Sequence, residues 1–320
     1  RAILPIMTPI PVNVDNFVRA ETDRMFAAIS QQAGGTNRWL HFRVPTPLDQ
    51  QTVIRMNRDT LYSAVVADIR DGAVLSIPDA GERYLSVMVI NQDHYINQVL
   101  HDPGQHTLDL ATFQSPYVLV AARTMVDPAD PLDVQAVNAL QDQLFLTAAS
   151  AVAFSTPDYD VETFTATREA VLTLAKGVGD FGGAFGRRAD ASPIRHLLGT
   201  AAGWGGLPES EAYYVNVDPG FPVGAYSLTV RDVPVDAFWS ISLYDGAGYF
   251  PDNGKPVSVN SLTATPNDDG SVTVHFGGSE DRPNTLPVVE GWNYLVRLYR
   301  PHSQVLDGSW TFPAATADQA

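Results

Sequence analysis

The chain has 320 residues, of which 45% are hydrophobic, and this length and composition predict a globular protein of two domains rather than a disordered one. Its formal net charge of −16 would repel phosphate backbones and anionic membrane surfaces, so we expect no nucleic acid partner. The absence of cysteine excludes disulfides, thiolate nucleophiles and cysteine-based zinc or iron–sulfur sites.

The first part of the chain predicts a helix followed by strands. Asn13 or Asp15 can cap the helix, and Gly34-Gly35 can end it. Alternating apolar residues then predict strands at residues 39–44, 61–68, 73–77, 84–91 and 117–123.

The middle of the chain is typical of a helical connector. Asp130-Pro131 indicates a helix start, a second helix is expected at residues 161–176, and a short third one at 194–198. The longest apolar run, residues 144–154, is too short and too rich in hydroxyl groups to span a bilayer, so it predicts a buried helix and no membrane insertion.

The last part returns to a strand pattern, at residues 226–231, 238–244, 257–265, 271–276 and 294–299. Asn267-Asp-Asp-Gly270 predicts a hairpin between two of these strands. The expected protein is mainly β, with an N-terminal helix and β-module at 1–128, a helical connector at 129–210 and a C-terminal β-sandwich module at 211–320.

Two distant segments share a pattern. In Tyr84-Leu-Ser-Val-Met-Val-Ile-Asn-Gln-Asp-His-Tyr95 and Phe238-Trp-Ser-Ile-Ser-Leu-Tyr-Asp-Gly-Ala-Gly-Tyr249, aromatic, Ser, apolar, Asn/Asp and Tyr positions coincide. The echo predicts two related β-modules whose polar strand ends could face one cleft. The alternative is that any two half-buried strands share such positions.

The first candidate site is Asn57-Arg-Asp-Thr-Leu-Tyr-Ser63, at the mouth of a predicted strand. Arg58 can present a bidentate fork to an anionic group, Asp59 can act as a base, and Tyr62 can donate a proton. Asn57 is expected to bind substrate. The alternative is a structural Arg–Asp tie at a capped turn.

The second candidate site is Asn91-Gln-Asp-His-Tyr95. His94 titrates near neutrality, Asn91 or Asp93 could orient its ring, and Tyr95 is a second proton donor. A divalent metal held by His94, His101, His106 and a carboxylate is a weaker hypothesis, because the spacing is not compact.

The third candidate site combines Asp245, Tyr249, Asn284 and Trp292. Carboxylates beside exposed rings are typical of sugar-binding surfaces, although core packing is the favoured interpretation for Trp292. No organic cofactor is expected, because Gly177-Val-Gly-Asp-Phe-Gly182 follows a helix rather than the strand that a dinucleotide fingerprint requires.

These motifs carry a resemblance to known families. The segment from Asn57 to Ser63, with the strand and turn up to Tyr95, resembles a bacterial family of unknown function numbered 1254. Phe238-Trp-Ser-Ile-Ser-Leu-Tyr-Asp245, Asn284-Thr-Leu-Pro287 and Leu295-Val-Arg-Leu-Tyr-Arg-Pro301 resemble its usual C-terminal companion, numbered 1214. The resemblance implies two β-sandwich or jelly-roll-like modules bridged by helices, and a secreted or periplasmic protein. Where the family numbered 1214 has the motif Asn-Trp-Leu-Pro, this chain has Asn284-Thr-Leu-Pro287, with Thr285 in place of the tryptophan.

Two functions follow as hypotheses. The first is a hydrolase or lyase that acts, without an organic cofactor, on a small polar or sugar-like substrate in a cleft between the modules. The second is a non-catalytic glycan or small-molecule binding protein of the cell envelope. The sequence leaves open a homo-oligomer, and because the chain opens on Arg1 we expect that something preceded it.

Overall fold

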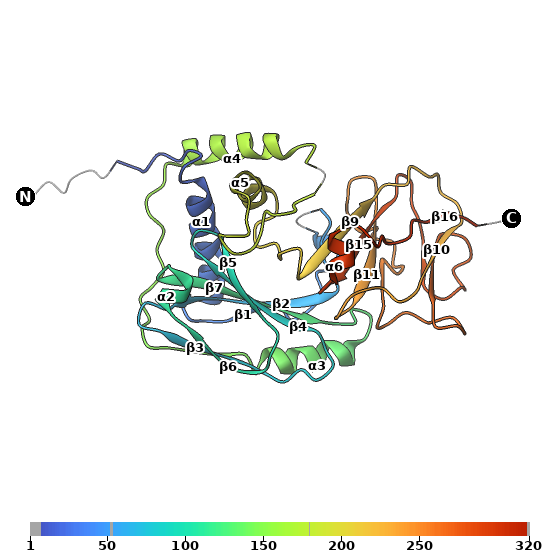
Figure 1. The fold of residues 1–320 in the computed structure, drawn as a ribbon, viewed down its shortest axis with the longest axis horizontal. Helices are drawn as coiled ribbons and strands as arrows, with labels where there is room; N and C mark the ends of the chain where they lie inside the picture. The colour runs from blue at the N-terminus through green and yellow to red at the C-terminus, as the bar shows by residue number, and fades with distance from the viewer. Residues whose placement is uncertain (1–7, 52–53, 179, 319–320) are drawn as a thin grey trace, which may run out of the picture. The chain divides into compact units, whose positions relative to one another are not determined.

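The computed structural model describes residues 8–51, 54–178 and 180–318, and within them the protein is mainly β, as predicted (Figure 1). It divides into two compact units. The first comprises the described residues up to His41, Tyr62–Arg123 and Ala139–Pro208, and the second comprises Phe42–Leu61, Thr124–Asn138 and the described residues from Glu209 onward. The division predicted from the sequence cuts the chain into consecutive segments at residues 128 and 210, whereas each of these units combines several separate segments. The predicted division stays a prediction.

Two facing sheets form the core of the first unit. One has the strand order β1-β2-β7-β4-β5 and the other β6-β3-β8. Alternate residues of β2, β3, β4 and β7, among them Val65, Leu75, Val87 and Val120, are buried between the sheets. The strands are β1 (Leu40–His41), β2 (Thr60–Asp68), β3 (Ala73–Ile77), β4 (Leu85–Asn91), β5 (Ile96–Leu100), β6 (Gly104–Leu108), β7 (Tyr117–Met125) and β8 (Phe145–Ala148).

Three helices of the first unit pack together, namely α1 (Phe17–Ala33), α4 (Val161–Ala175) and α5 (Pro193–Ala202) (Figure 1). Phe17, Val171 and Leu198 form the centre of their contact. Helix α1 ends at Gly34, whose φ of 80° is the left-handed conformation that glycine adopts without steric cost. Two short elements, α2 (Leu110–Phe113) and α3 (Pro131–Gln141), flank β7 in the chain, and α3 begins directly after Asp130, as predicted.

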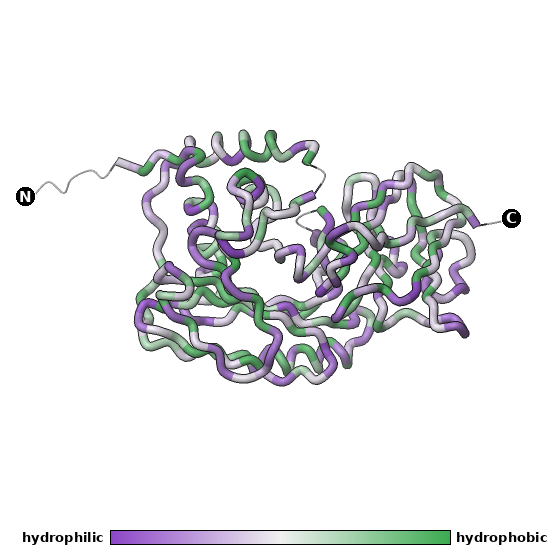
Figure 2. Tube along the Cα trace, viewed as in Figure 1, coloured by the Kyte–Doolittle hydropathy of each residue, from purple (hydrophilic) through white to green (hydrophobic). Residues whose placement is uncertain are grey.

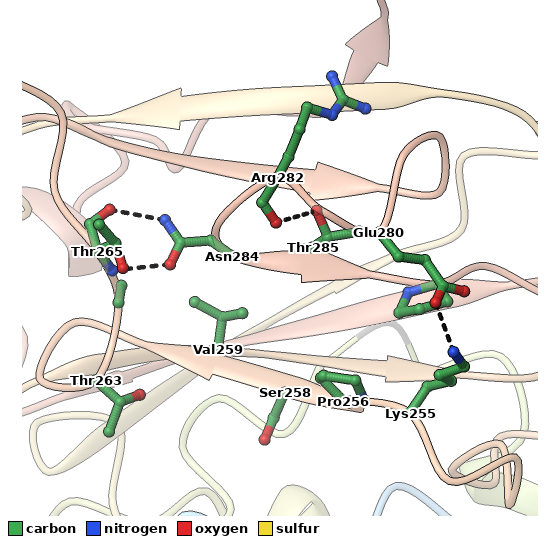
Figure 3. Close-up of a pocket in the computed structure, with 12 residues that line it drawn as sticks. Lys255, Pro256, Ser258, Val259, Thr263, Thr265, Glu280, Arg282, Asn284 and Thr285 are labelled. Carbon is green, nitrogen blue, oxygen red and sulfur yellow. Dashed lines mark hydrogen bonds and ion pairs between the residues drawn. The ribbon is translucent and has the colours of Figure 1, made fainter.

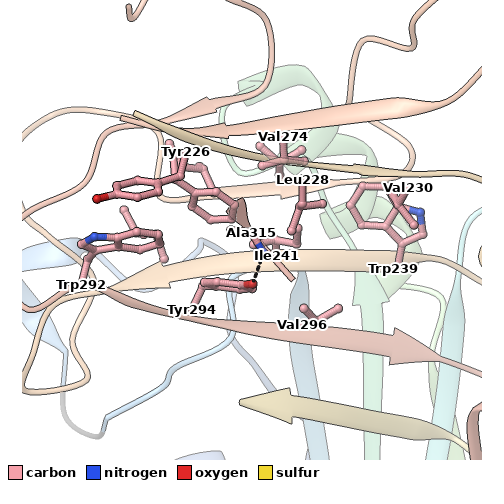
Figure 4. Packing of buried hydrophobic residues seen from close by; sticks show 14 of the residues in the cluster. Tyr226, Leu228, Val230, Trp239, Ile241, Val274, Trp292, Tyr294, Val296 and Ala315 are labelled. Atoms are coloured by element: carbon pink, nitrogen blue, oxygen red, sulfur yellow. Dashed lines mark hydrogen bonds between the residues drawn. The ribbon is translucent and has the colours of Figure 1, made fainter. Parts of the chain in front are cut away.

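The second unit is also a sandwich of two sheets, with strand orders β12-β11-β15-β9 and β14-β13-β10-β16. Its core is rich in aromatic rings, and Trp292, Tyr294 and Phe276 lie against one another in it (Figure 4). The elements are η1 (Leu48–Gln50), β9 (Ala212–Val217), β10 (Tyr226–Val230), β11 (Trp239–Tyr244), β12 (Ser258–Asn260), β13 (Val272–Phe276), β14 (Thr285–Leu286), β15 (Asn293–Tyr299), α6 (Ser303–Leu306) and β16 (Thr316–Ala317).

The two sandwiches are copies of one topology. Strands β2, β3, β4, β5, β6, β7 and β8 correspond in chain order to β9, β10, β11, β12, β13, β15 and β16. The sheet β5-β4-β7-β2 then matches β12-β11-β15-β9, and β6-β3-β8 matches β13-β10-β16. The inward residues correspond as well, since Leu85 and Val87 of β4 take the places of Trp239 and Ile241 of β11. The structure therefore supports the two related modules that the sequence echo predicts.

Hydrophobic stretches run along the strands (Figure 2), and this pattern accounts for the accurate strand predictions, such as 73–77 for β3. Two strands are shorter than predicted, since β1 covers Leu40–His41 of 39–44 and β12 covers Ser258–Asn260 of 257–265. Two further predictions were wrong. Residues 144–154 form no helix; they contain β8, an edge strand paired with β3, in which Phe145 is 61% exposed. Asn267–Gly270 is a turn closed by a Gly270 N–H···Asn267 O bond, but the strands β12 and β13 before and after it belong to different sheets.

Candidate functional site

Asp59, the expected base, lies in the interior of the second unit. Its carboxylate accepts a hydrogen bond from Ser240 Oγ at 2.6 Å and a longer one from the Tyr299 hydroxyl at 3.4 Å. Burial raises the pKa of Asp59, while the charge of Arg297 and these two hydrogen bonds act to lower it. The residue Asp59 is 2% exposed. A substrate in solution therefore does not reach its carboxyl group.

Arg297 of β15 is the buried cation of the same network. Its Nη1 donates to Ser242 Oγ at 2.7 Å, and its Nη2 donates to the Tyr244 hydroxyl at 2.8 Å. Nη2 also reaches the carbonyl oxygens of Arg55 and Met56, at 3.0 and 3.1 Å. Because these groups bind one another, the network fastens the segment before β2 to the polar face of β11 and β15.

The neighbours of Asp59 take different parts. Asn57 accepts from the Asp59 N–H at 2.8 Å and donates to the Tyr299 hydroxyl at 2.9 Å, which makes it a turn residue. Arg58 is half-buried and donates to the carbonyl oxygen of Thr46. Burial lowers the pKa of Arg58. Within the described residues no ion pair joins Arg58 to Asp59, so the structural tie considered as an alternative is not formed.

In the first unit, the turn after β4 is built by Asn91. Its Oδ1 accepts from the backbone N–H groups of Asp93 and Tyr95, both at 3.0 Å, and its Nδ2 donates to the Phe113 carbonyl. The second unit repeats this turn after β11, where Asp245 Oδ1 accepts from the N–H groups of Ala247 and Tyr249. Asn91 and Asp245 are thus occupied in backbone bonds rather than directed at a ligand.

His94, the expected acid or base, is completely buried, and its tautomer follows from its partners. The Thr200 hydroxyl donates its only proton to the His196 carbonyl, so His94 Nδ1–H must donate to Thr200 Oγ1 at 2.8 Å. His94 Nε2 accepts from the Gly205 N–H at 2.9 Å. Burial, assisted by His196, lowers the pKa of His94 well below its usual value. Both nitrogens of this neutral ring are used, which fits a positioning role.

Tyr95 and Asp93 contact His196, and Tyr62 is linked to His94 through Arg123 and Gly205. Tyr95 stacks on His196 of α5, with ring centroids 4.4 Å apart, and the carbonyl oxygen of Asp93 faces His196 Nε2. The Asp93 carboxylate binds Arg19 at 2.6 Å. Tyr62 lies under the guanidinium of Arg123, which donates to the Gly205 carbonyl at 2.8 Å. Three predicted proton-transfer residues, Tyr62, His94 and Tyr95, are therefore brought into one region of the first unit.

Sequence reasoning missed a buried carboxyl group on α1. Asp23 is 2% exposed and accepts from Gln92 Nε2 and from the Tyr159 hydroxyl, both at 2.9 Å. Burial raises its pKa, and the pKa of Tyr159 is raised as well, by burial and then by Asp23. The sequence feature that could have indicated this buried carboxyl group is the position of Asp23 on the apolar side of α1, three residues before the buried Phe26.

A pocket of about 470 Å³ lies in the second unit, at an open side of the sandwich between the edge strands β12 and β14 (Figure 3). We call it the edge pocket. Its walls come from two segments of the chain and carry hydroxyl, amide and charged groups. They comprise Lys255, Pro256, Ser258, Val259, Thr263, Ala264, Thr265, Glu280, Arg282, Asn284, Thr285 and Pro287.

The edge pocket is formed where the second sandwich departs from the first. Residues 92–95 join β4 to β5, whereas residues 245–257 join the corresponding strands β11 and β12. Residues 101–103 join β5 to β6, whereas 261–271 join β12 to β13. These two connections supply five of the twelve lining residues. Residues 277–292, which join β13 to β15 and contain the added strand β14, supply five more, whereas residues 109–116 join the corresponding strands β6 and β7. Variable connections on a fixed scaffold are where proteins commonly place binding sites.

Asn284 is the predicted site residue that lines this pocket, and its side chain is fully engaged. Oδ1 accepts from the Thr265 N–H at 2.8 Å, and Nδ2 donates to the carbonyl oxygens of Thr265 and Thr273 (Figure 3). Asn284 adopts the left-handed conformation, with φ of 56°. It therefore fixes one wall. Thr285, the position that differs from the resembled motif, also lines the pocket.

The other candidates of the second unit lie elsewhere. Trp292 is 1% exposed in the core (Figure 4), in agreement with the favoured interpretation. Tyr249 closes the turn that Asp245 organises. Sequence reasoning missed Ser258, which begins the short strand β12, and Lys255, Thr263 and Glu280, which lie in irregular connections. Their only signal was the unusual length of these connections and their content of Asn, Gly, Ser and Thr.

Two findings concern other kinds of site. Across residues 8–51, 54–178 and 180–318, no three His, Asp or Glu side chains are grouped so that they could hold a metal ion. In the same part of the chain, no helix has both the length and the apolar character needed to cross a bilayer.

The fold and the pocket define a duplicated β-sandwich protein with a polar site in its second copy. Residues 36–148 match a family described as a protein of unknown function, DUF1254, and residues 222–303 match another, DUF1214. The chain thus pairs these two families in the order that its motifs indicated.

A solved structure shows the same fold. The VPA0106 protein from Vibrio parahaemolyticus is similar over 96% of this chain and 100% of that chain, with 18% identity and a TM-score of 0.71. A weaker similarity, with 16% identity and a TM-score of 0.49, covers 90% of this chain and 84% of an uncharacterised protein from Burkholderia cenocepacia. A search of curated proteins found no match.

Proposed function

We propose that this protein binds a small, hydroxylated polar molecule in the edge pocket of its second unit. The observation that carries the proposal is the placement of the pocket in those connections that distinguish the second sandwich from the first. Its volume of about 470 Å³ lies in the usual range of sites for small molecules, roughly 300–1,000 Å³.

The chemistry of the walls favours a polar ligand. Four hydroxyl residues line the pocket, Ser258, Thr263, Thr265 and Thr285, and hydroxyl groups both donate and accept hydrogen bonds. Val259 and Pro287 add apolar surface against which a ring could pack. A saccharide or a related polyol fits this combination, because it presents hydroxyl groups around an apolar ring face.

The structure favours binding over catalysis as the role of this pocket. A hydrolase or lyase needs a base that reaches its substrate, and Glu280 is the pocket's only carboxylate. No histidine and no second carboxylate is among the described residues that line the pocket with Glu280, and the expected base Asp59 is buried in a satisfied network. The enzymatic function and a site shared by both modules stay predictions.

A thermal-shift and calorimetry screen of saccharides, polyols and small organic acids tests the proposal. A ligand present at about one hundred times its Kd should add about 2.7 kcal/mol to the free energy of unfolding. The variant Thr263→Trp places an indole in the pocket and should abolish binding. Leu262→Trp is the matched control, since Leu262 is exposed and adjacent but does not line the pocket.

Each outcome is decisive for the site. Binding that survives Thr263→Trp unchanged, or that Leu262→Trp removes equally, would place the ligand elsewhere and contradict the proposal. The absence of any hit across the screen would also count against it. Mass spectrometry of each bound ligand after incubation separates binding from turnover, and a new product would revive the enzymatic prediction.

A further inference from the structure

The edge pocket is lined by two cations, one of which belongs to a residue type that is rare in this chain. The formal net charge is −16, and the sequence contains only two lysines, Lys176 and Lys255. Lys255 lines the pocket together with Arg282, and Glu280 is the pocket's single acidic residue. Arg282 is paired with Asp318 and Lys255 with Glu280, so a cation becomes available to a ligand where one of these pairs exchanges its carboxylate. An anionic group on the ligand can take the place of that carboxylate.

The two cations of the pocket differ in how they are held. Arg282 binds Asp318 at 2.8 Å with a guanidinium that points away from the Lys255–Glu280 pair (Figure 3). Lys255 Nζ binds Glu280 Oε2 at 2.5 Å, and the two side chains are 46% and 53% exposed. A pair this exposed contributes little to folding, so Lys255 can exchange its partner at small cost.

The Lys255–Glu280 pair also connects the two walls of the pocket. Lys255 lies in the connection before β12, and Glu280 lies in the connection before β14 (Figure 3). A second carboxylate that enters between these walls meets Lys255 at the same point as Glu280 does. Carboxylates of similar basicity compete for one ammonium group, which offers three donors.

We infer that the ligand of the edge pocket is a hydroxylated carboxylic acid, such as a sugar acid, whose carboxylate takes Lys255 from Glu280. This rests on the proposed function and specifies its ligand. The hydroxyl groups of the ligand bind the threonine and serine side chains of the walls, while its carboxylate binds Lys255. Glu280 is then a built-in competitor that occupies the cation when the pocket is empty.

Calorimetry with matched pairs of ligands tests this inference on the full chain: glucuronate against glucose, and galacturonate against galactose. The acid of at least one pair should bind about tenfold tighter than its neutral partner, the ratio expected for one charge-assisted hydrogen bond. Lys255→Met should remove this preference. Glu280→Gln should strengthen binding of the acid severalfold, because it removes the competing carboxylate. Raising the salt concentration should weaken binding of the acid more than binding of the sugar.

The other lysine supplies the matched control. Lys176→Met removes the same charge from the end of α4 in the first unit and should leave the preference unchanged. Equal binding of acids and neutral sugars, or a preference that survives Lys255→Met, would overturn the inference while the pocket remained a binding site. Binding by no member of either pair would remove the inference, and if Thr263→Trp still blocked some other ligand, the proposed function would stand without it.

Discussion

Asn91 and Asp245 hold the same position in two copies of one turn, about half the chain apart. Each side-chain oxygen accepts from the backbone N–H groups two and four residues further on, at 3.0 and 3.0 Å for Asn91 and at 2.9 and 3.0 Å for Asp245. The backbone closes each turn identically, through the pairs Asn91–Tyr95 and Asp245–Tyr249. The positive φ that the turn requires falls on His94 in one copy and on Gly248 in the other.

The equivalence predicts that Asp245 works through its oxygen and not through its charge. Asp245→Asn should change the free energy of unfolding by less than about 0.5 kcal/mol, whereas Asp245→Ala should lower it by about 1–2 kcal/mol. Urea denaturation measures both. Asn91→Asp serves as the contrast, because it also loses the buried bond from Nδ2 to the Phe113 carbonyl and should be destabilising. An equal loss for Asp245→Asn and Asp245→Ala would refute this role.

The sequence predicted those strands that alternate clearly, such as β3, and the duplication that follows from the echo. Prediction from the sequence failed where one pattern of residues is compatible with two different secondary structures. Residues 144–154 are apolar enough for a buried helix, but β8 instead pairs along β3 from Ala73 to Ser76, and tertiary pairing outweighed local preference. The hairpin prediction failed because the strands around 267–270 join different sheets, and turn residues do not record the sheet to which a strand belongs.

The candidate site was less predictable for a physical reason. Asp59 looked available because its partners, Ser240 and Tyr299, lie more than 180 positions away in the chain, and no local pattern reveals them. Of the residues that line the edge pocket, Asn284 stood out through its motif. Hydroxyl residues such as Ser258, on the edge strand β12, and Thr263, in the connection after it, occur throughout the chain, so only the folded structure shows that they share a wall.

Removing one member of the Asp59–Arg297 pair should leave the charge of the other buried and unpaired. Asp59→Ala leaves Arg297 without its carboxylate, and Arg297→Met leaves Asp59 without its cation, so each should lower the free energy of unfolding by about 3–5 kcal/mol. The double variant should lose less than the sum. A double-mutant cycle in urea measures this coupling, and strictly additive losses would show that Asp59 and Arg297 do not act as a pair.

Two glycines of the second unit allow the cost of a steric clash to be separated from the cost of a positive φ. Gly277 has φ of 69°, and a Cβ there would lie 2.1 Å from the Gly224 carbonyl oxygen, whereas Gly270 has φ of 81° with no atom within 4 Å of the same position. Gly270→Ala should therefore cost about 1–2 kcal/mol from its φ alone. Gly277→Ala should cost clearly more, because the Gly224 backbone must move. If the two variants lost equal stability in thermal denaturation, the Gly224 carbonyl would move aside at no cost in free energy.

The buried His94 makes stability depend on pH in a direction that its pKa fixes. In the unfolded chain a histidine takes up a proton near pH 6.5, whereas folded His94 stays neutral because burial lowers its pKa. The unfolded state therefore binds more protons below this pH, and the free energy of unfolding should fall on acidification, by up to about 1.4 kcal/mol per pH unit. Asp23 and Asp59 have raised pKa values and act in the opposite sense, so a variant must isolate the histidine.

The variant His94→Asn isolates the contribution of His94 to the pH dependence, because asparagine tolerates the φ of 62° at this position and does not titrate there. The variant should be less stable than the wild type at pH 7, since it loses the ring that stacks on Trp204. Between pH 7 and 5.5 its free energy of unfolding should fall less steeply than that of the wild type, while His106→Asn on β6 should keep the wild-type slope. Urea denaturation across this range gives the three slopes. A His94→Asn slope as steep as the wild type's would mean that His94 accepts its proton in the folded state, against the hydrogen bond that Gly205 donates to Nε2.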